Sequence, residues 1–139
     1  MSARNDGRPP RLYGARIAVS SFVVVLATRI ALCLFRYKTI RKWLPDARGH
    51  ENSRFYARRI AVAVRRSARF IPAATCLTQA LAAQYLLARS GHRSTIRIGA
   101  RRDRDGRLEA HAWLLCEDVV VLGGSDEELA DLVPLTDLN

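Results

Sequence analysis

The fold is decided by one stretch, Pro72-Ala-Ala-Thr-Cys-Leu-Thr-Gln-Ala-Leu-Ala-Ala-Gln-Tyr-Leu-Leu-Ala-Arg-Ser-Gly91, which predicts a single helix. Thr75 is a suitable N-cap for a helix that begins at Cys76, and Gly91 lies where a chain can leave a helix in the left-handed conformation. Apolar side chains recur at spacings of three and four residues, as on a buried helix face. These are Leu77, Ala80, Leu81, Ala83, Leu87 and Ala88. We therefore expect the rest of the chain to surround this helix.

Cys76 is expected in the first turn of that helix. Free backbone N–H groups and the positive end of the helix dipole lie there, and both stabilise a thiolate over a thiol. A thiolate so placed is a prepared nucleophile. Free cysteine is also among the residue types most often buried as a small hydrophobe, so the position alone leaves a packing role open.

A histidine on a predicted strand favours the catalytic interpretation. Residues Leu108 to Cys116 alternate as a strand does, and His111 lies among them. Histidine is the side chain best able to deprotonate a thiol near neutral pH. A cysteine that opens a buried helix and a histidine on a following strand form the nucleophile and base of a papain-like or transglutaminase-like hydrolase.

Length and cysteine usage bound the class of protein. A chain of 139 residues with 49% hydrophobic content fits one globular domain with a modest core. The three cysteines, Cys33, Cys76 and Cys116, include no C-x-x-C pair, so we expect neither a disulfide framework nor a structural zinc site. Zinc bound by Cys76, His111 and Cys116 would have an unfamiliar ligand spacing. We expect no cofactor and a reducing, cytoplasmic location.

The net charge of +10 is unevenly placed. Residues 1–100 carry 19 Lys and Arg against three acids, a net +16, and residues 101–139 carry four Arg against ten acids, a net −6. Such a distribution favours a partner steered by electrostatics: an acidic peptide, another protein, nucleic acid or a membrane surface. A solvated, arginine-rich exterior explains the same charge without a partner.

Residues Ala15 to about Trp43 form the most apolar part of the chain and predict a long amphipathic helix. The uncharged run Ile17 to Thr28 has 12 residues, which we interpret as too short to span a membrane. Contact with a membrane surface stays open, because several basic side chains could face lipid headgroups. The side chains expected to be buried are Val24, Leu26, Ile30, Leu34 and Phe35, and the basic ones are Arg29, Arg36, Lys38 and Arg41.

A second amphipathic helix and an antiparallel sheet complete the prediction. The helix covers Phe55 to Phe70 with a basic face, and Pro72 separates it from the cysteine helix. Strands are predicted at Ser94 to Arg101, Leu108 to Cys116 and Val119 to Leu122, with a turn at Glu117-Asp118. Ser125 could cap an acidic turn over 126–131, after which the chain is expected to tail off. Helices followed by an antiparallel meander indicate an α+β fold.

Several of these segments resemble the transglutaminase-like leader peptidases of lasso-peptide biosynthesis. They are Thr75-Cys76-Leu77 at a helix start, Gly91-His-Arg93, the strand Ile96-Arg-Ile-Gly-Ala-Arg101 and above all Ala110-His111-Ala112-Trp113. The resemblance runs from about Ala15 to Leu135. It implies one cysteine peptidase domain (15–139), with a basic helical part (15–70) and a papain-like catalytic core (72–139). Residues 1–14 are polar and contain Gly7 and Pro9-Pro10, which predicts a flexible N-terminus.

The resemblance also implies the partners. They are a precursor peptide as substrate, a leader-recognition domain protein and an ATP-dependent lasso cyclase, and no nucleic acid is expected. The chain would be the stand-alone peptidase, since it has no room for the recognition domain.

In that family an aspartate on or after the strand that follows the histidine strand orients the histidine. Here the strand Val119 to Leu122 runs into Gly123-Gly124-Ser125, and Asp126 is the nearest candidate. Asp126 could equally be a charge at a helix start, and Glu117 and Asp118 are expected to be solvated. Without an acid, a backbone carbonyl or an amide could orient His111. The Cys76 backbone N–H is the expected oxyanion donor.

The remaining chemically capable side chains are interpreted as structural. Trp113 is expected in the core on the face opposite His111, and Cys33 and Cys116 are expected to pack. His50 and His92 are expected in exposed loops. The competing function is a non-catalytic, arginine-rich binding module for an acidic peptide, a partner protein or a membrane surface.

Overall fold

The computed structural model describes residues 11–35, 37–45, 47, 53–124 and 132–138. Within these residues helices come first and strands follow, as the sequence predicts. The helices are α1 (Arg11–Leu34), α2 (Tyr37–Arg41), α3 (Ser53–Ala68) and α4 (Cys76–Arg89). The strands are β1 (Thr95–Arg102), β2 (Leu108–Cys116), β3 (Val119–Leu122) and β4 (Val133–Leu138).

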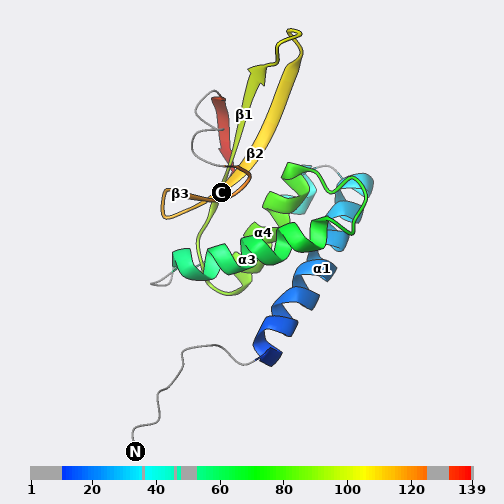
Figure 1. Ribbon diagram of the computed structural model, residues 1–139, viewed down its shortest axis with the longest axis vertical. Coiled ribbons are helices and arrows are strands. Elements are labelled where there is room, and N and C mark those ends of the chain that lie inside the picture. The colour runs from blue at the N-terminus through cyan, green and yellow to red at the C-terminus, as the bar shows by residue number, and fades with distance from the viewer. Residues whose placement is uncertain (1–10, 36, 46, 48–52, 125–131, 139) are drawn as a thin grey trace, which may run out of the picture.

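The strands form one antiparallel sheet in the order β3-β2-β1-β4. The helices gather beside one end of the sheet, and the β1–β2 hairpin extends beyond them (Figure 1). Alternate residues of β2, Ala112, Leu114 and Cys116, are buried in the same core cluster as α4. The expected α+β fold is confirmed.

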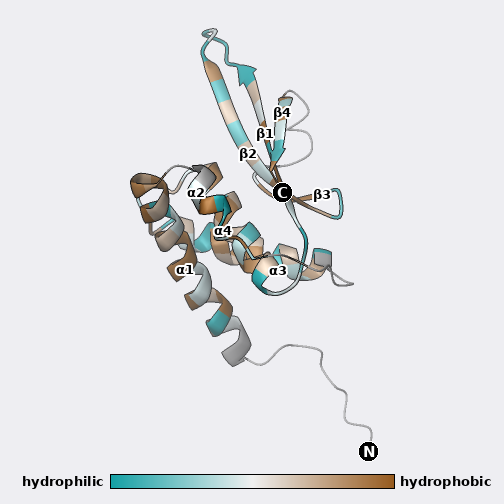
Figure 2. Ribbon diagram, turned by 180° about the vertical axis from the view of Figure 1, so that it is seen from behind, coloured by the Kyte–Doolittle hydropathy of each residue, from teal (hydrophilic) through white to brown (hydrophobic). Residues whose placement is uncertain are grey.

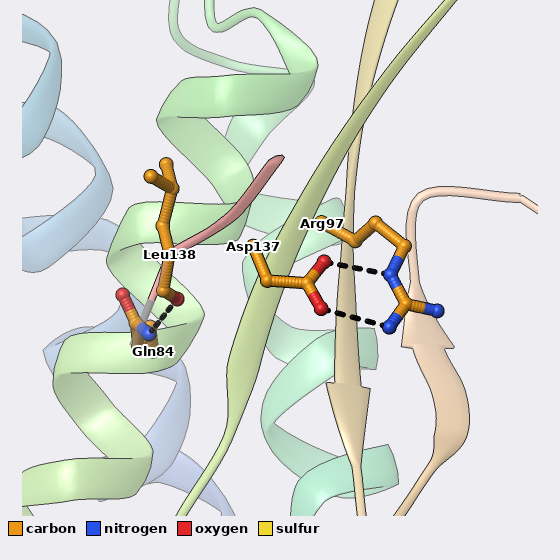
Figure 3. A network of polar contacts seen from close by, with 4 residues as sticks. All are labelled: Gln84, Arg97, Asp137 and Leu138. Carbon is orange, nitrogen blue, oxygen red and sulfur yellow. Dashed lines mark hydrogen bonds and ion pairs between the residues drawn. The ribbon is translucent and has the colours of Figure 1, made fainter. Parts of the chain in front are cut away.

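Helix α4 is the element around which the others pack. It begins at Cys76 as expected, and the Thr78 N–H donates to the Thr75 side-chain oxygen at 3.3 Å. Gly91 follows its end at φ 82°. The buried Gln84 joins α4 to one end of the sheet, where β1 begins and β4 ends, because its side-chain amide donates to the carbonyls of Ser94 and Leu138, each at 3.2 Å (Figure 3 shows the second bond).

The expectation for the first helix is wrong in two respects. The helix ends at Leu34, and α2 is a separate short helix. The side chains expected in the core lie largely outside it: Leu26, Ile30, Leu34 and Phe35 are exposed and Val24 is half-buried, whereas Ser21 and Val25 are fully buried. Apolar residues occur on every side of α1, so periodicity could not indicate which side would contact α3 and α4.

The C-terminus does not tail off, because residues 133–138 form the edge strand β4 against β1. The pairing contains an irregularity between Ile98 and Gly99, and Pro134 lies in β4, where an edge strand tolerates proline. Arg97 donates from Nε and from Nη2 to the two carboxylate oxygens of Asp137, at 2.7 and 2.8 Å (Figure 3). This bidentate ion pair fastens β4 to the sheet.

We expect Asp137→Asn to weaken that attachment in a pH-dependent way. The hydrogen bond from Arg97 lowers the pKa of Asp137, so the carboxylate stabilises the fold above the ordinary aspartate pKa and loses this effect as pH falls through the lowered value. Both side chains are partly exposed, so the loss in free energy of unfolding at neutral pH should stay below about 1 kcal/mol. Urea unfolding at neutral and strongly acidic pH would measure it.

The matched control for that measurement is Asp105→Asn at the exposed hairpin tip. It should change stability little at either pH. A wild-type advantage over Asp137→Asn that persists below the pKa of Asp137 would contradict the assignment of the effect to the ion pair.

Candidate active site

Cys76 and His111, the predicted pair, line one small pocket of about 240 Å³. Cys76 comes from the start of α4 and His111 from β2, so the packing of helix on sheet brings them together. The Cys76 pocket is lined by Arg65, Cys76, Gln79, His111, Leu122, Gly123 and Gly124. A half-buried thiol and an imidazole in one pocket are the parts of a cysteine nucleophile with its base.

The first turn of α4 leaves hydrogen-bond donors beside the thiol. Thr75 accepts the N–H of Thr78 with its side chain and the N–H of Gln79, at 3.0 Å, with its carbonyl. Among the described residues, the backbone N–H groups of Cys76 and Leu77 have no hydrogen-bond partner, as is usual in a first helical turn. They can therefore stabilise negative charge on a carbonyl oxygen that Cys76 attacks.

A backbone carbonyl fixes the His111 ring. The ring atom Nε2 is hydrogen-bonded to the Gly123 carbonyl at the end of β3. A carbonyl oxygen can only accept, so Nε2 must carry the proton and Nδ1 is left with the lone pair of a base. No hydrogen bond joins the Cys76 sulfur to His111 within the part of the chain that the structure describes.

The backbone position that presents this carbonyl to His111 requires a glycine at residue 123. Its φ is 110°, and a Cβ at Gly123 would lie 2.6 Å from Trp113 Cβ and 2.8 Å from the Ala112 carbonyl oxygen. Both separations are shorter than real Cβ contacts allow. The sequence analysis did not identify Gly123 as a functional residue. The consecutive glycines Gly123-Gly124 were the feature of the sequence that could have indicated a position where only glycine fits.

Trp113 lies on the same face of β2 as His111, and the opposite expectation is wrong. The two residues are two apart, and side chains two apart on a strand share a face. Their ring centroids are 6.5 Å apart with the rings nearly parallel at 21°. Trp113 is 4% exposed and packs with Leu115 and Leu132, so its expected burial is confirmed.

The tryptophan ring also requires a glycine on the neighbouring strand. Gly99 pairs with His111 in the β1–β2 register, and a Cβ there would lie 2.7 Å from Cη2 of Trp113. Trp113 therefore lies over the gap that Gly99 leaves, beside the histidine.

The other two cysteines differ from each other. Cys116 is buried as expected, its thiol donates to the Arg93 carbonyl, and burial raises its pKa. Cys33 is exposed, so the packing role expected for it is wrong, and its sulfur accepts from Arg29 at 2.7 Å. Among the described residues, no three His, Cys, Asp or Glu side chains gather as a metal site would require.

Of the other acidic candidates and histidines, those that the structure describes (Glu117, Asp118 and His92) do not line the Cys76 pocket. Glu117 forms an exposed ion pair with Arg54 at 2.9 Å. His92 is half-buried against the Tyr56 ring, at 4.7 Å between centroids, rather than exposed. Asp126, the acidic turn over 126–131 and His50 lie outside the described residues.

Comparison with known proteins identifies the family. The family model described as the Transglutaminase-like superfamily matches residues 22–137, which include α4, β1, β2, β3 and all of β4 except its last residue, and this match confirms the expected papain-like core. Neither a curated protein nor a solved structure matched the chain. The transglutaminase-like fold commonly carries cysteine protease or transglutaminase activity. From this match over most of its length, the chain belongs to the transglutaminase-like superfamily.

Proposed function

We propose that the protein is a cytoplasmic cysteine peptidase that removes the leader from a lasso-peptide precursor during biosynthesis of this ribosomally made, post-translationally modified peptide. The observation that carries the proposal is the shared pocket of Cys76 and His111 on a transglutaminase-like fold. The choice of lasso precursors rests on the resemblance of Ala110-His111-Ala112-Trp113 and of the cysteine helix to leader peptidases.

The chemistry follows from the geometry of the pocket. Nδ1 of His111 takes the proton of the Cys76 thiol, and the thiolate attacks the carbonyl carbon of the leader–core bond. The N–H groups at the start of α4 stabilise the oxyanion, and the imidazolium then protonates the leaving amine of the core. Water, deprotonated by His111, hydrolyses the thioester and frees the leader. Substrate binding would draw the thiol and the imidazole into hydrogen-bonding distance.

The proposed partners are the precursor peptide, a leader-recognition domain protein and an ATP-dependent lasso cyclase. The test is to incubate the protein with precursors encoded near it, with and without the recognition protein, and to weigh the products by mass spectrometry. A released core of the expected mass supports the proposal. Intact precursors under every condition, with the precursor bound, would contradict it.

The competing candidate is a non-catalytic, arginine-rich binding module for an acidic peptide, a partner protein or a membrane surface. The absence of a hydrogen bond between Cys76 and His111 in the described structure and the net +16 of residues 1–100 favour it. A module of this kind would bind its ligand equally well after Cys76→Ala and would release no product.

We propose Asp126 as the third catalytic residue because it follows β3 in the sequence; its carboxylate would share the Nε2 proton of His111 with the Gly123 carbonyl. Asp126→Asn should then lower kcat by about ten- to a thousandfold with KM nearly unchanged, because it acts on the histidine rather than on the peptide. Single-turnover cleavage rates at saturating precursor would measure the loss, with Asp118→Asn as the control. A wild-type rate for Asp126→Asn would leave Cys76 and His111 as a dyad oriented by the Gly123 carbonyl.

A further inference from the structure

Helix α1 presents an apolar stripe that no described part of the chain covers. Its six members are exposed by 39% to 69%. We call them the α1 stripe: Val19, Phe22, Val23, Leu26, Ile30 and Leu34. No charged side chain belongs to it, and brown runs along much of α1 in Figure 2. A stripe of this length is unusual on the surface of a water-soluble domain.

One side of α1 packs against the rest of the domain, and this limits how α1 can interact with a membrane. Ser21 and Val25 are fully buried, and Val25 belongs to the core cluster of α3 and α4. By length and composition the segment Gly14–Leu34 could cross a membrane, so the expectation that this region is too short is wrong. Crossing would pull Val25 out of the core, whereas lying along a surface would not.

An aromatic pair continues the stripe at the C-terminal end of α1. Phe35 and Trp43 meet edge to face with ring centroids 5.3 Å apart, and both are about half exposed. The indole of Trp43 has an apolar body and a polar N–H, which suits the boundary between lipid chains and headgroups.

In the sequence, the charged residues that flank the stripe are of one sign. No acidic residue occurs between Asp6 and Asp46, although eight basic residues do. Away from the stripe, Arg58, Arg59 and Arg66 of α3 line an apolar groove of about 450 Å³ with Gly14, Ile17 and Ala18 of α1. Two copies packed through the α1 stripe would bring the basic residues of this segment together, whereas anionic phosphates would complement them.

We propose that the α1 stripe binds the surface of an anionic membrane, with α1 lying in the plane of the interface and the basic residues at the headgroups. The apolar side chains would enter the boundary layer while the buried side of α1 stays on α3 and α4. The inference does not depend on peptidase activity.

The chain carries its own reporter for the test. It has two tryptophans, and Trp113 is buried whereas Trp43 is 53% exposed beside the stripe. With the full chain and vesicles of phosphatidylcholine containing about one-third phosphatidylglycerol, we expect a blue shift of Trp43 fluorescence and co-flotation of the protein. Vesicles of phosphatidylcholine alone should bind at least about tenfold more weakly, and salt should weaken binding to the anionic vesicles.

Two kinds of variant test the two parts of the interaction. Val19→Glu and Ile30→Glu should each lower the vesicle partition coefficient at least about tenfold, because a carboxylate would enter the apolar boundary. Arg41→Gln with Lys42→Gln leaves the stripe intact and should lower it about fivefold or more. The matched control is Leu108→Glu, since Leu108 is as exposed as the stripe but lies on the hairpin β1–β2. It should bind as the wild type does.

Three outcomes would overturn the proposal. The first is wild-type binding by the stripe variants with unchanged thermal unfolding. The second is equal binding to neutral and anionic vesicles. The third is sedimentation of the wild type as a dimer that Val19→Glu makes monomeric, without vesicle binding, which would assign the stripe to self-association.

Discussion

Cys76→Ala and His111→Ala should each abolish leader release, with a loss of at least about ten-thousandfold in single-turnover rate. The nucleophile and its base act as one unit, so removal of either leaves only binding and the oxyanion donors. Neither side chain belongs to the fully buried core, so both variants should keep the circular dichroism and thermal unfolding of the wild type. Mass spectrometry of quenched time points would measure the rate.

The chain supplies matched controls in its other two cysteines. Cys33→Ala removes an exposed thiol and should change neither rate nor stability measurably. Cys116→Ser alters a buried thiol and should cost stability but not the rate of the folded fraction. Near-normal cleavage by either Cys76→Ala or His111→Ala would refute the assigned pair, whichever substrate is used.

The parts of the fold that rest on local signals were predictable. The cap at Thr75, the left-handed Gly91 and the apolar spacing between them predict α4 at its observed start. The turn at Glu117-Asp118 has both residues at positive φ, as a type I′ hairpin turn requires, and it lies where predicted. Each signal involves residues close in sequence, so no knowledge of the packing was needed.

Two features could not be predicted because they depend on distant partners. The burial of Ser21 and Val25 rather than Leu26 and Ile30 depends on where α3 and α4 contact a helix that has apolar residues on every side. Strand β4 forms because it pairs with the backbone of β1 and because Arg97 binds Asp137. A short segment that contains a proline gives little indication of a strand from its own sequence.

In the Cys76 pocket, too, some features could be predicted from the sequence and others could not. Residue type and position predict Cys76 and His111 as the reactive pair, because the thiol and the imidazole are themselves the reactive groups and are visible in the sequence. The group that holds the imidazole is a main-chain carbonyl, which any residue possesses, so no residue type could indicate it. The only part of this arrangement that is visible in the sequence is the glycine that steric contacts require at position 123.

Because only glycine fits at this position, we expect Gly123→Ala to lower both kcat and stability. The added methyl group would lie 2.6 Å from Trp113 Cβ, and φ 110° is strained for any L side chain. The end of β3 must therefore shift, and its carbonyl moves away from Nε2 of His111. Because a displacement of about 1 Å can cost a hundredfold in rate, we expect kcat to fall about a hundredfold or more. The free energy of unfolding should fall by roughly 1–3 kcal/mol.

Gly106→Ala separates the backbone strain from the effect on the histidine. Gly106 also has positive φ, at 77°, but no atom lies within 4 Å of a Cβ built there. It should lose stability through strain alone and keep the wild-type kcat. Nitrogen NMR of labelled His111 gives a readout that a loss of stability does not move: the proton should reside on Nε2 in the wild type and in Gly106→Ala, and the two tautomers should mix in Gly123→Ala. If folded Gly123→Ala retained both the wild-type kcat and the Nε2 proton, the Gly123 carbonyl would not be the group that orients His111.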